Sequence, residues 1–592
     1  MTIELEKKEE KHELRRLEKA ALDFSSLRTQ MVLSTLLILI SCLVNYWPTL
    51  KTGFLLDDFL HVDYCARAHA GDWQSFLGNF TGNWGGSDLM VSYRPLISLS
   101  IFADYLLYRT QPWGYHLSNI LIFAGCSILV SFLTLELTKH AAPRLSSTLA
   151  LFAGLLFSVY PLHVETVAWI IGRVDSVATF FYLASLLYFL RHFQHQERKF
   201  HILSLVTFVA ALTSKEIAVS LPLAIFILAY TRPQKAGQGA LQHLIFAVKS
   251  TIPYVATLIL FALFRHCLLG TTVGGYGSRS FNLVELVNVF LNKDSLLKLI
   301  VPVSEEYRYV NTAIKPAVAP VMALAALLFA RLIFARAGKN KGKIKLSPAM
   351  FTIPLLMVWC IGALLPAFQI WHIFPNLVGS RLFFLSSVPF CMVLALKALP
   401  AQGPIESGHL KKWCVAGLFL VSLLFIIWTN LLAVNLQAWI DASARMKVFK
   451  HELQQLLVER DKTVPGGTII LANMPQDYKG AGMVGRRQYL DILLTPPLVT
   501  KDLRHRIVTI DSKGLYYDPI ALKKALEHRA PIYFFDKESG HFQLEKPTDP
   551  AAEKSLYFSL ATNDRKTLDQ DFPEISKVDG TRWHEENPEK AL

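Results

Sequence analysis

The chain has 592 residues, of which 52% are hydrophobic and only 18% are charged, and its mean hydropathy is +0.34. This balance argues against a soluble globular protein and indicates a membrane protein. The net charge of +14 is spread over the loops between apolar runs. We therefore interpret it as the positive charge of cytoplasmic loops and not as a surface that binds nucleic acid.

About eleven apolar runs are candidate membrane spans, because a helix needs about 20 mainly apolar residues to cross the hydrocarbon of a bilayer. The predicted fold class is thus an α-helical polytopic membrane protein with about 11 transmembrane helices. Before them, residues 1–30 form a charged, helix-prone cytoplasmic segment without the pattern of a cleavable signal peptide. The predicted spans are 31–50, 113–137, 147–162, 176–190, 201–214, 217–231, 246–266, 317–335, 349–370, 382–397 and 413–434.

The distribution of Lys and Arg predicts how these spans are oriented. Basic residues gather in the N-terminal segment, in the loop 331–345 and in the segment 397–412, whereas the short intervening loops hold one each. Because Lys and Arg are enriched in cytoplasmic loops, we predict a cytoplasmic N-terminus. Polar groups of alternate loops then meet at one extracytoplasmic face. They are Asp57, Asp58, the loop 163–175, Lys215, Glu216, the loop 267–316 and Arg381.

Two segments outside the spans have a composition of their own. Residues 51–112 form a large first external loop, in which 93–108 is predicted to be a helix on the membrane surface. After residue 440 an amphipathic helix ends at Pro465-Gly466-Gly467, and two strands, 468–475 and 506–511, precede a helix at 518–531. We therefore predict a membrane domain of residues 31–440 and a small extracytoplasmic α/β domain, with a charged tail, of residues 441–592.

Two adjacent aspartates stand at the edge of a membrane segment in the sequence FLLDDFLHVDY, where Asp57 and Asp58 follow apolar residues. One interpretation is that they cap a surface helix. The other is functional, because a carboxylate close to the hydrocarbon is costly and marks a site. An ionised carboxylate there can take a proton from a hydroxyl nucleophile, and two carboxylates can share a divalent cation.

The loop VYPLHVETVAWIIGRVDS carries a second group of polar residues, which includes His163, Glu165 and Asp175. Such residues can pair with their neighbours and close a tight helical turn. Alternatively, they form an acceptor site or, together with the aspartates of the first loop, a site for a divalent metal. Carboxylates suit magnesium or manganese, and imidazole suits zinc or manganese. Whether a metal is required stays open at this point.

Three cations, Arg94, Lys215 and Arg381, are predicted at the external edge of the membrane. Each can form an ion pair with a nearby carboxylate or cap a helix, and Lys215 is directly followed by Glu216. Alternatively, a lysine binds a phosphate as a point charge, and an arginine grips it with two parallel hydrogen bonds. A lipid that carries a phosphate head group is the ligand that such a set would suit.

Several segments, in this order, are similar to a known family of membrane enzymes. They are LLDDFLHVDY, YRPLISLS, GYHLSNILIF, LLFSVYPLHVETVAWIIGRVDSVATFFYL, SKEIAVSLP and SRLFFLSSVPF. Residues 30–440 resemble the membrane part of the transmembrane-and-TPR protein O-mannosyltransferases and their bacterial relatives, which belong to the glycosyltransferase C (GT-C) superfamily. The animal members end in tetratricopeptide arrays, whereas no repeat of about 34 residues follows residue 440 here.

This resemblance implies a multi-span enzyme that uses a polyprenyl-phosphate sugar and has an acidic pair in its first external loop. By position, it assigns Asp57 or Asp58 as the catalytic base and Arg94 and Arg381 as partners of the donor. The function it implies is transfer of a mannose-like hexose or a pentose, with inversion, to a hydroxyl group of an acceptor glycan, lipid or protein.

Two other classes of function fit a polytopic membrane chain: a transporter or flippase of lipid-linked substrates, and a lipid-binding scaffold. A transporter would show inverted repeats and broken helices with ionisable residues at the midplane, and the sequence shows neither. An acidic pair beside external cations argues against a scaffold. We therefore favour a glycosyltransferase of the bacterial inner membrane, in contact with membrane lipids and with its C-terminal domain in the periplasm.

Overall fold

The computed structural model describes most of the membrane part and most of the C-terminal part of the chain. The predicted span 317–335, the basic loop 331–345 and most of the segment 1–30 lie outside the described residues, as does the predicted tail. The described residues are 26–86, 91–139, 145–230, 240–272, 291–307, 349–367, 370–397, 408–510, 519–536 and 539–544, with Ala552 and Ser555.

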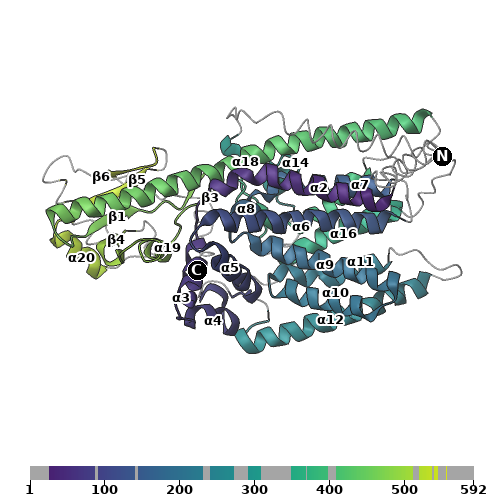
Figure 1. The fold of residues 1–592 in the computed structure, drawn as a ribbon, viewed down its shortest axis with the longest axis horizontal. Coiled ribbons are helices and arrows are strands. Elements are labelled where there is room, and N and C mark those ends of the chain that lie inside the picture. Colours follow the sequence, from purple (N-terminus) through teal and green to yellow (C-terminus); the bar gives the residue numbers. More distant parts are fainter. Residues whose placement is uncertain are drawn as a thin grey trace, which may run out of the picture.

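Five helices of the described part are long and apolar enough to cross a membrane, and a sixth span results if one bent helix pair is counted. They lie side by side along the long axis of the molecule (Figure 1). The protein is therefore a helical membrane protein, as its composition indicates. The five helices are α2 (Leu27–Tyr46), α6 (Pro112–Thr138), α9 (Arg173–His195), α12 (Ala240–Leu269) and α18 (Gly408–Thr463).

The remaining predicted spans within the described residues coincide with shorter helices. The first of these, α7, ends before Pro161, because proline lacks the N–H that would continue the helix. The chain then bends by 48° into the turn that carries Glu165. The number of eleven spans stays a prediction. The shorter helices are α7 (Ser146–Val159), α10 (Arg198–Leu212), α11 (Leu221–Tyr230), α16 (Ala349–Leu364) and α17 (Ser387–Lys397).

Helix α9 lies inside the bundle and α12 at its outside. Within the apolar window of each helix, 78% of residues are buried in α9 but only 11% in α12. Ser185 of α9 and Ser204 of α10 each donate a hydrogen bond to the other's carbonyl oxygen, both at 2.8 Å. Small polar residues join helices in this way in an apolar environment, where close backbone approach is favourable. Helix α9 therefore forms part of the interior of the bundle, where it is joined to α10.

Short helices and loops gather at one end of the bundle (Figure 1). Residues predicted to be a helix on the membrane surface, 93–108, do form a helix, α5, at this end. The longer of these helices are α3 (Asp58–His69), α4 (Gln74–Thr81), α5 (Pro95–Tyr108), α8 (Val164–Ala168) and α14 (Lys293–Ile300). The 3-10 helices are η1 (Trp47–Lys51), η2 (Trp84–Gly86), η3 (Pro161–His163), η4 (Glu216–Ser220), η5 (Glu305–Tyr307), η6 (Leu365–Ala367) and η7 (Ser380–Phe383).

The C-terminal part holds a four-stranded sheet of order β4-β1-β5-β6. Strand β1 pairs in parallel with β4 and β5, while β6 is antiparallel to β5. The two predicted strands and the predicted helix are present as β1, β4 and α20. The elements are β1 (Ile469–Asn473), β2 (Asp477–Tyr478), β3 (Ala481–Gly482), α19 (Arg487–Leu493), η8 (Arg504–Arg506), β4 (Ile507–Thr509), α20 (Pro519–Glu527), β5 (Ile532–Asp536) and β6 (His541–Leu544).

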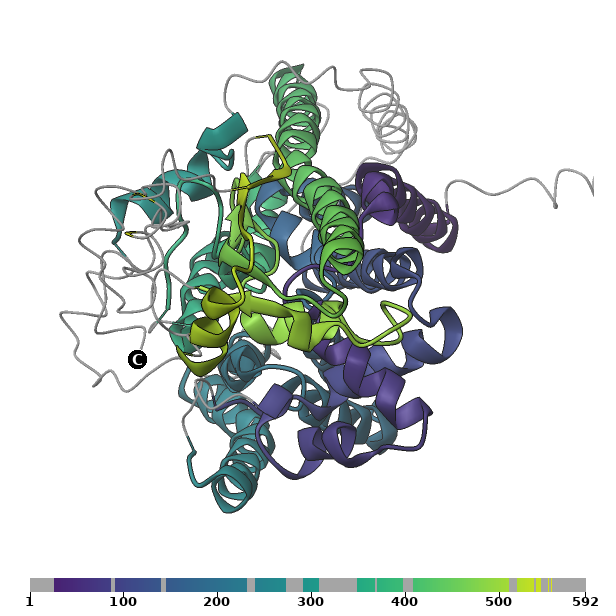
Figure 2. The ribbon, with the colours of Figure 1, turned by 90° about the vertical axis from the view of Figure 1, so that its left-hand side faces the viewer.

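Helix α18 joins the bundle to this C-terminal unit, which we define as residues 464–544, without a break at residue 440, where the sequence predicts a domain boundary. It ends at Thr463, just before the predicted stop at Pro465. One side of the sheet forms a small core of its own with α20. The side that faces α18, together with α19 and the β2–β3 hairpin, belongs to the large hydrophobic core of the bundle. Seen along the long axis, the unit lies over the end of the bundle (Figure 2).

Candidate functional site

The acidic pair follows a sharp change in backbone direction. Leu55 is buried, and Leu56 has a positive φ of 52°, a conformation that is uncommon for a residue with a side chain. The Leu56 N–H donates a hydrogen bond of 2.7 Å to the carbonyl oxygen of Met483 in the C-terminal unit. Asp57 is the residue directly before helix α3, and Asp58 is the first residue of that helix. This turn places the two aspartates next to each other at the start of α3.

Asp58 is buried and holds two loops together. Its Oδ2 accepts a hydrogen bond from the Leu55 N–H at 2.9 Å, and its Oδ1 accepts one from the Ile171 N–H at 3.0 Å. Burial and the adjacent Asp57 raise the pKa of the Asp58 carboxyl well above its usual range, against the effect of these backbone hydrogen bonds. With both oxygens engaged, Asp58 is suited to fix the first loop against residues 169–172.

Asp57 has a carboxylate that is available for chemistry. Its Oδ1 is buried and has no hydrogen-bond partner among the described residues. Burial raises the pKa of Asp57 to about 6, while the positive charges of Arg381, Arg486 and Arg94 act in the opposite direction. A carboxylate with a pKa close to neutrality can accept a proton from a hydroxyl group and later release it. Of the two aspartates, Asp57 is therefore the candidate for a general base.

Arg381, from η7, is held by residues of the α8 turn. The Arg381 backbone N–H donates to Glu165 Oε2 at 3.1 Å, and its Nε lies 3.6 Å from Glu165 Oε1. The guanidinium lies over the ring of Trp169, 4.9 Å from its centre, and Trp169 in turn stacks on Trp439 of α18. The sequence predicts Glu165 and Arg381 at one face, and the structure brings them into contact.

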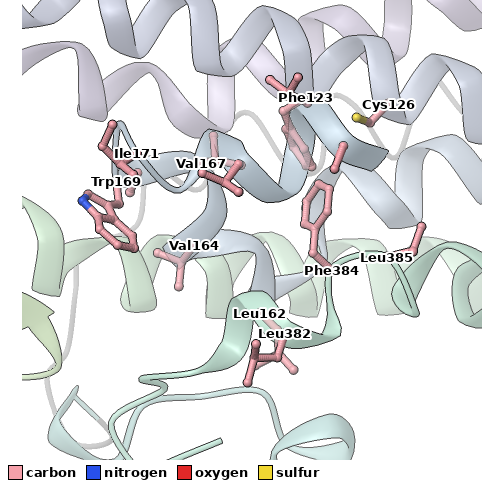
Figure 3. Close-up of a cluster of buried hydrophobic side chains, with 14 of the residues drawn as sticks. Phe123, Cys126, Leu162, Val164, Val167, Trp169, Ile171, Leu382, Phe384 and Leu385 are labelled. Atoms are coloured by element: carbon pink, nitrogen blue, oxygen red, sulfur yellow. The ribbon is translucent and has the colours of Figure 1, made fainter. Parts of the chain in front are cut away.

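The α8 turn owes its position to apolar packing. Figure 3 shows Val164, Val167 and Trp169 on this turn, between Phe123 of α6 and the segment that continues from η7. All of these side chains belong to one buried cluster. Because the backbone of the turn is packed on both sides, Glu165 and Trp169 hold Arg381 in one place.

Arg94 lies close to the site but is engaged by a carboxylate. Its Nη2 donates to Glu216 Oε2 at 2.9 Å, and Arg265 lies 3.8 Å from the other oxygen of Glu216. The Arg94 guanidinium also covers the ring of Trp84, which stacks on His61 at 4.2 Å. Arg94 thus contributes positive charge to the surroundings of Asp57 from a buried ion pair.

Lys215 forms a buried ion pair. Its Nζ lies 2.5 Å from Asp175 Oδ1, and the two side chains are only 5% and 2% exposed. The neighbouring Arg173 is equally buried and pairs with Asp104 of α5 at 2.6 Å. These two pairs tie the start of α9 to α5 and to the segment just before η4. This ion pair favours a structural role for Lys215 and Asp175, and their assignment to the site stays a prediction.

His163 lies in apolar surroundings, whereas Glu165 contacts Arg381. Its ring is enclosed by four aromatic rings, and its Nε2 lies 2.7 Å from Ser387 Oγ. Within the described ranges, no group of three or more His, Cys, Asp or Glu side chains could hold a metal ion. The Asp58 oxygens and Glu165 Oε2 already accept hydrogen bonds from N–H groups. These residues do not fit a magnesium or manganese site, and we derive no step through a metal.

Sequence reasoning missed three residues that the structure adds to the site. Trp169 and Trp439 form the support of Arg381, and Arg486 of the C-terminal unit acts on Asp57. Tryptophans next to an apolar run are ordinary in a membrane protein, where aromatic residues gather at the interface. Arg486 stands in a segment of unremarkable composition, so only its position in the fold marks it.

Comparison with known proteins bears on this arrangement. No protein-family model matches the chain. The protein O-mannosyl-transferase Tmtc2 of Drosophila melanogaster is 36% identical over 191 residues, which are 30% of this chain and 19% of the fly protein. Tmtc3 of the same fly is 31% identical over 173 residues (26% and 19%), and human TMTC3 is 32% identical over 151 residues (25% and 16%).

This chain resembles the protein O-mannosyl-transferases. The resemblance stated from the sequence motifs is therefore confirmed. The chain spans about one fifth, or less, of the length of these O-mannosyl-transferases, so the similarity concerns a part of each protein.

Proposed function

We propose that the protein is a membrane glycosyltransferase that transfers a mannose-like hexose or a pentose from a polyprenyl phosphate to an acceptor hydroxyl. The observation that carries this proposal is the Asp57 carboxylate, which has an oxygen without a hydrogen-bond partner among the described residues and whose pKa is lowered by the charges of three arginines against the effect of burial. The similarity to O-mannosyl-transferases supports the class of reaction. Transport or a scaffold role gains no comparable support.

In the proposed reaction, the acceptor hydroxyl gives its proton to Asp57 while its oxygen forms a bond to the anomeric carbon of the sugar. The bond between that carbon and the phosphate oxygen breaks, and the electron pair leaves with polyprenyl phosphate. A single displacement inverts the configuration at the anomeric carbon. A pKa of about 6 leaves Asp57 mostly ionised at neutral pH, as a base must be.

Arg381 is the proposed partner of the donor phosphate. The phosphate gains negative charge as it leaves, and a fixed cation beside it lowers the barrier because the charge is met without reorganisation. Glu165 and Trp169 hold the Arg381 guanidinium in position, which reduces the entropic cost of aligning the reactants. Arg94, which is paired with Glu216, adds positive charge in the surroundings of Asp57.

We further propose the orientation that follows from the loop charges. The N-terminus is cytoplasmic, and the end of the bundle with α3, α5 and the C-terminal unit is extracytoplasmic, in a bacterial inner membrane facing the periplasm. All residues assigned to the reaction lie at this end, so the donor and the acceptor meet outside the cytoplasm.

Two single substitutions test the proposal in membranes supplied with a polyprenyl-phosphate sugar. Asp57→Asn removes the base, so we expect a loss of about 10²-fold or more in the transfer rate, with unchanged stability to heating. Asp58→Asn places an amide NH₂ against a backbone N–H, and we expect a loss of stability of about 1–3 kcal/mol.

Full activity in both single variants and in the double variant would refute the assignment of a base. A rate loss in Asp58→Asn alone, with normal stability, would transfer the role from Asp57 to Asp58. The comparison thus separates the reacting carboxylate from the one that holds the loops.

A further inference from the structure

One segment of the C-terminal unit, residues 475–486, contacts the loop that carries the acidic pair. We call it the hairpin segment, because it contains β2 and β3. The Leu56 N–H donates to Met483 O at 2.7 Å. A Cβ on Gly482 would lie 2.2 Å from Leu56 Cδ1, so a larger residue there would force the Leu56 side chain to move. The residue directly before Asp57 is therefore held by the hairpin segment.

The same segment contacts the loop that leads to Arg381. At the tip of the hairpin, Gly480 has a φ of +86°, and a Cβ there would lie 2.5 Å from the carbonyl oxygen of Asn376. A small pocket lies at this contact, and its lining includes Glu165, Trp439 and Gly480. The hairpin segment thus adjoins both Asp57 and the support of Arg381.

The hairpin segment is firmly held. Tyr478, Ala481, Met483 and Val484 are all buried and belong to the same hydrophobic core as the membrane helices. Arg445 of α18 covers the ring of Tyr478, 3.6 Å from its centre. The segment is therefore built into the bundle and is not a loosely attached part of a separate domain.

Arg486 closes the hairpin segment at the start of α19, which packs against α3. It is half-buried, and no hydrogen bond or ion pair joins its side chain to another described residue. Its charge acts on Asp57 and lowers the pKa of that carboxyl. Arg94 and Lys215, in contrast, are engaged by Glu216 and Asp175.

This charge is placed where a reaction of the proposed kind needs it. The donor phosphate is a diester with one negative charge, and the polyprenyl phosphate that leaves is a monoester with a second one. A cation that is not already neutralised by a carboxylate can meet this additional charge. Arginine is the side chain best shaped for it, because its guanidinium donates two parallel hydrogen bonds to a phosphate.

We propose that Arg486 of the C-terminal unit binds the phosphate of the donor together with Arg381, so that the C-terminal unit supplies one of the donor-binding residues. This inference rests on the proposed function, and it names the residues that hold the donor. The hairpin segment has a positioning role: it fixes Leu56 and Asn376, and through them the loops of Asp57 and Arg381.

A binding experiment tests the proposal without sugar transfer. The full chain in lipid nanodiscs is titrated with farnesyl phosphate, and with farnesol as a ligand of the same chain that lacks the phosphate. We expect Arg486→Ala to weaken farnesyl phosphate binding by about tenfold or more, the scale of lost hydrogen bonds to a charged group. Arg486→Lys should lose less, and farnesol binding should not change in either variant.

Arg504→Ala is the matched control, because Arg504 is an exposed arginine of the same unit that pairs with Asp502. It should bind farnesyl phosphate like the unmodified protein. Arg486→Gln provides the measurement if Arg486→Ala does not fold. Unchanged farnesyl phosphate affinity in folded Arg486→Ala or Arg486→Gln would overturn the proposal, and so would a failure of the unmodified protein to prefer farnesyl phosphate over farnesol.

The transfer assay separates this inference from the proposed function. In Arg486→Ala, we expect a higher KM for the donor, an unchanged KM for the acceptor and an acid limb of the rate that moves to higher pH. The direction follows because Arg486, like Arg381 and Arg94, lowers the pKa of Asp57. Removing the charge of Arg486 therefore raises this pKa, and the ionised base is lost at a higher pH.

The outcomes are distinct. Transfer that depends on Asp57 but shows an unchanged donor KM and pH profile in Arg486→Ala would refute the role of Arg486 and leave the function in place. Absence of transfer in the unmodified protein, with farnesyl phosphate binding that depends on Arg486, would refute the function and leave the phosphate site in place.

Discussion

Replacement of Lys215 by methionine distinguishes a structural ion pair from a phosphate ligand. The Lys215 Nζ lies 2.5 Å from Asp175 Oδ1, and both side chains are almost completely buried. Lys215→Met removes the charge but keeps an unbranched, flexible apolar side chain, so little packing is lost. What remains is a buried Asp175 without its partner, which costs about 3–5 kcal/mol.

The assay is the fraction of protein that stays monodisperse in detergent after heating, followed by a donor titration of the folded fraction. We expect Lys215→Met to denature at a clearly lower temperature, with an unchanged KM for the donor. The double variant Lys215→Met with Asp175→Leu should regain most of the stability, because an apolar pair often replaces a buried ion pair without loss.

A different result would refute this reasoning. If Lys215→Met were as stable to heating as the unmodified protein and had a higher KM for the donor, the lysine would be a phosphate ligand. The ion pair with Asp175 would then not be its main role.

Three further predictions concern the reaction. Arg381→Ala should raise the KM for the donor more than Arg381→Lys, because only a guanidinium grips a phosphate with two hydrogen bonds and stacks on Trp169; equal KM values for both variants and the unmodified protein would indicate a structural cap. The rate of transfer should fall below about pH 6, because burial raises the pKa of Asp57 to about 6 and only the ionised form accepts a proton. A rate that does not change within about one pH unit on either side of this pKa would contradict the assignment of Asp57 as the base. Excess EDTA should leave activity unchanged, because the candidate ligands are engaged elsewhere, and loss of activity that manganese or magnesium restores would show the opposite.

Much of the site could be predicted from the sequence because charged residues are conspicuous in an apolar chain. Asp57, Glu165 and Arg381 stand at the ends of apolar runs, where a charge is costly, and the orientation of the spans places them at one face. The structure brings Glu165 and Arg381 into contact at 3.6 Å. Helix positions were predictable for the same reason, since each predicted span within the described residues coincides with a helix.

The partners of the buried charges could not be predicted. The hydropathy pattern shows where a charged residue stands in the sequence, but not which residue it contacts in the fold. Lys215 is followed by Glu216, yet it binds Asp175, and Glu216 binds Arg94. These contacts depend on how helices pack side by side. Arg486 carries no signal in the sequence, because its charge acts on Asp57 only through the packing of the hairpin segment on Leu56.

The lengths of the helices could not be predicted from the sequence either. Residues 147–162 read as one apolar run, but Pro161 and the bend after α7 divide it and turn α8 toward Arg381. The hydropathy of a segment depends only on its residue types, so it does not show where a helix bends or ends. Helices α11 and α17 are short for the same kind of reason: the apolar run extends into a 3-10 segment before each of them.

Helix α18 has 56 residues, and at 1.5 Å per residue it is about 84 Å long. It contains no proline, and it runs from the bundle into the C-terminal unit without an interruption. Such a continuous helix couples the two parts of the chain mechanically, so that a displacement of the C-terminal unit would be passed on to the bundle along α18. If the C-terminal unit keeps this position during the proposed reaction, the donor and the acceptor would approach the site from the side of the unit.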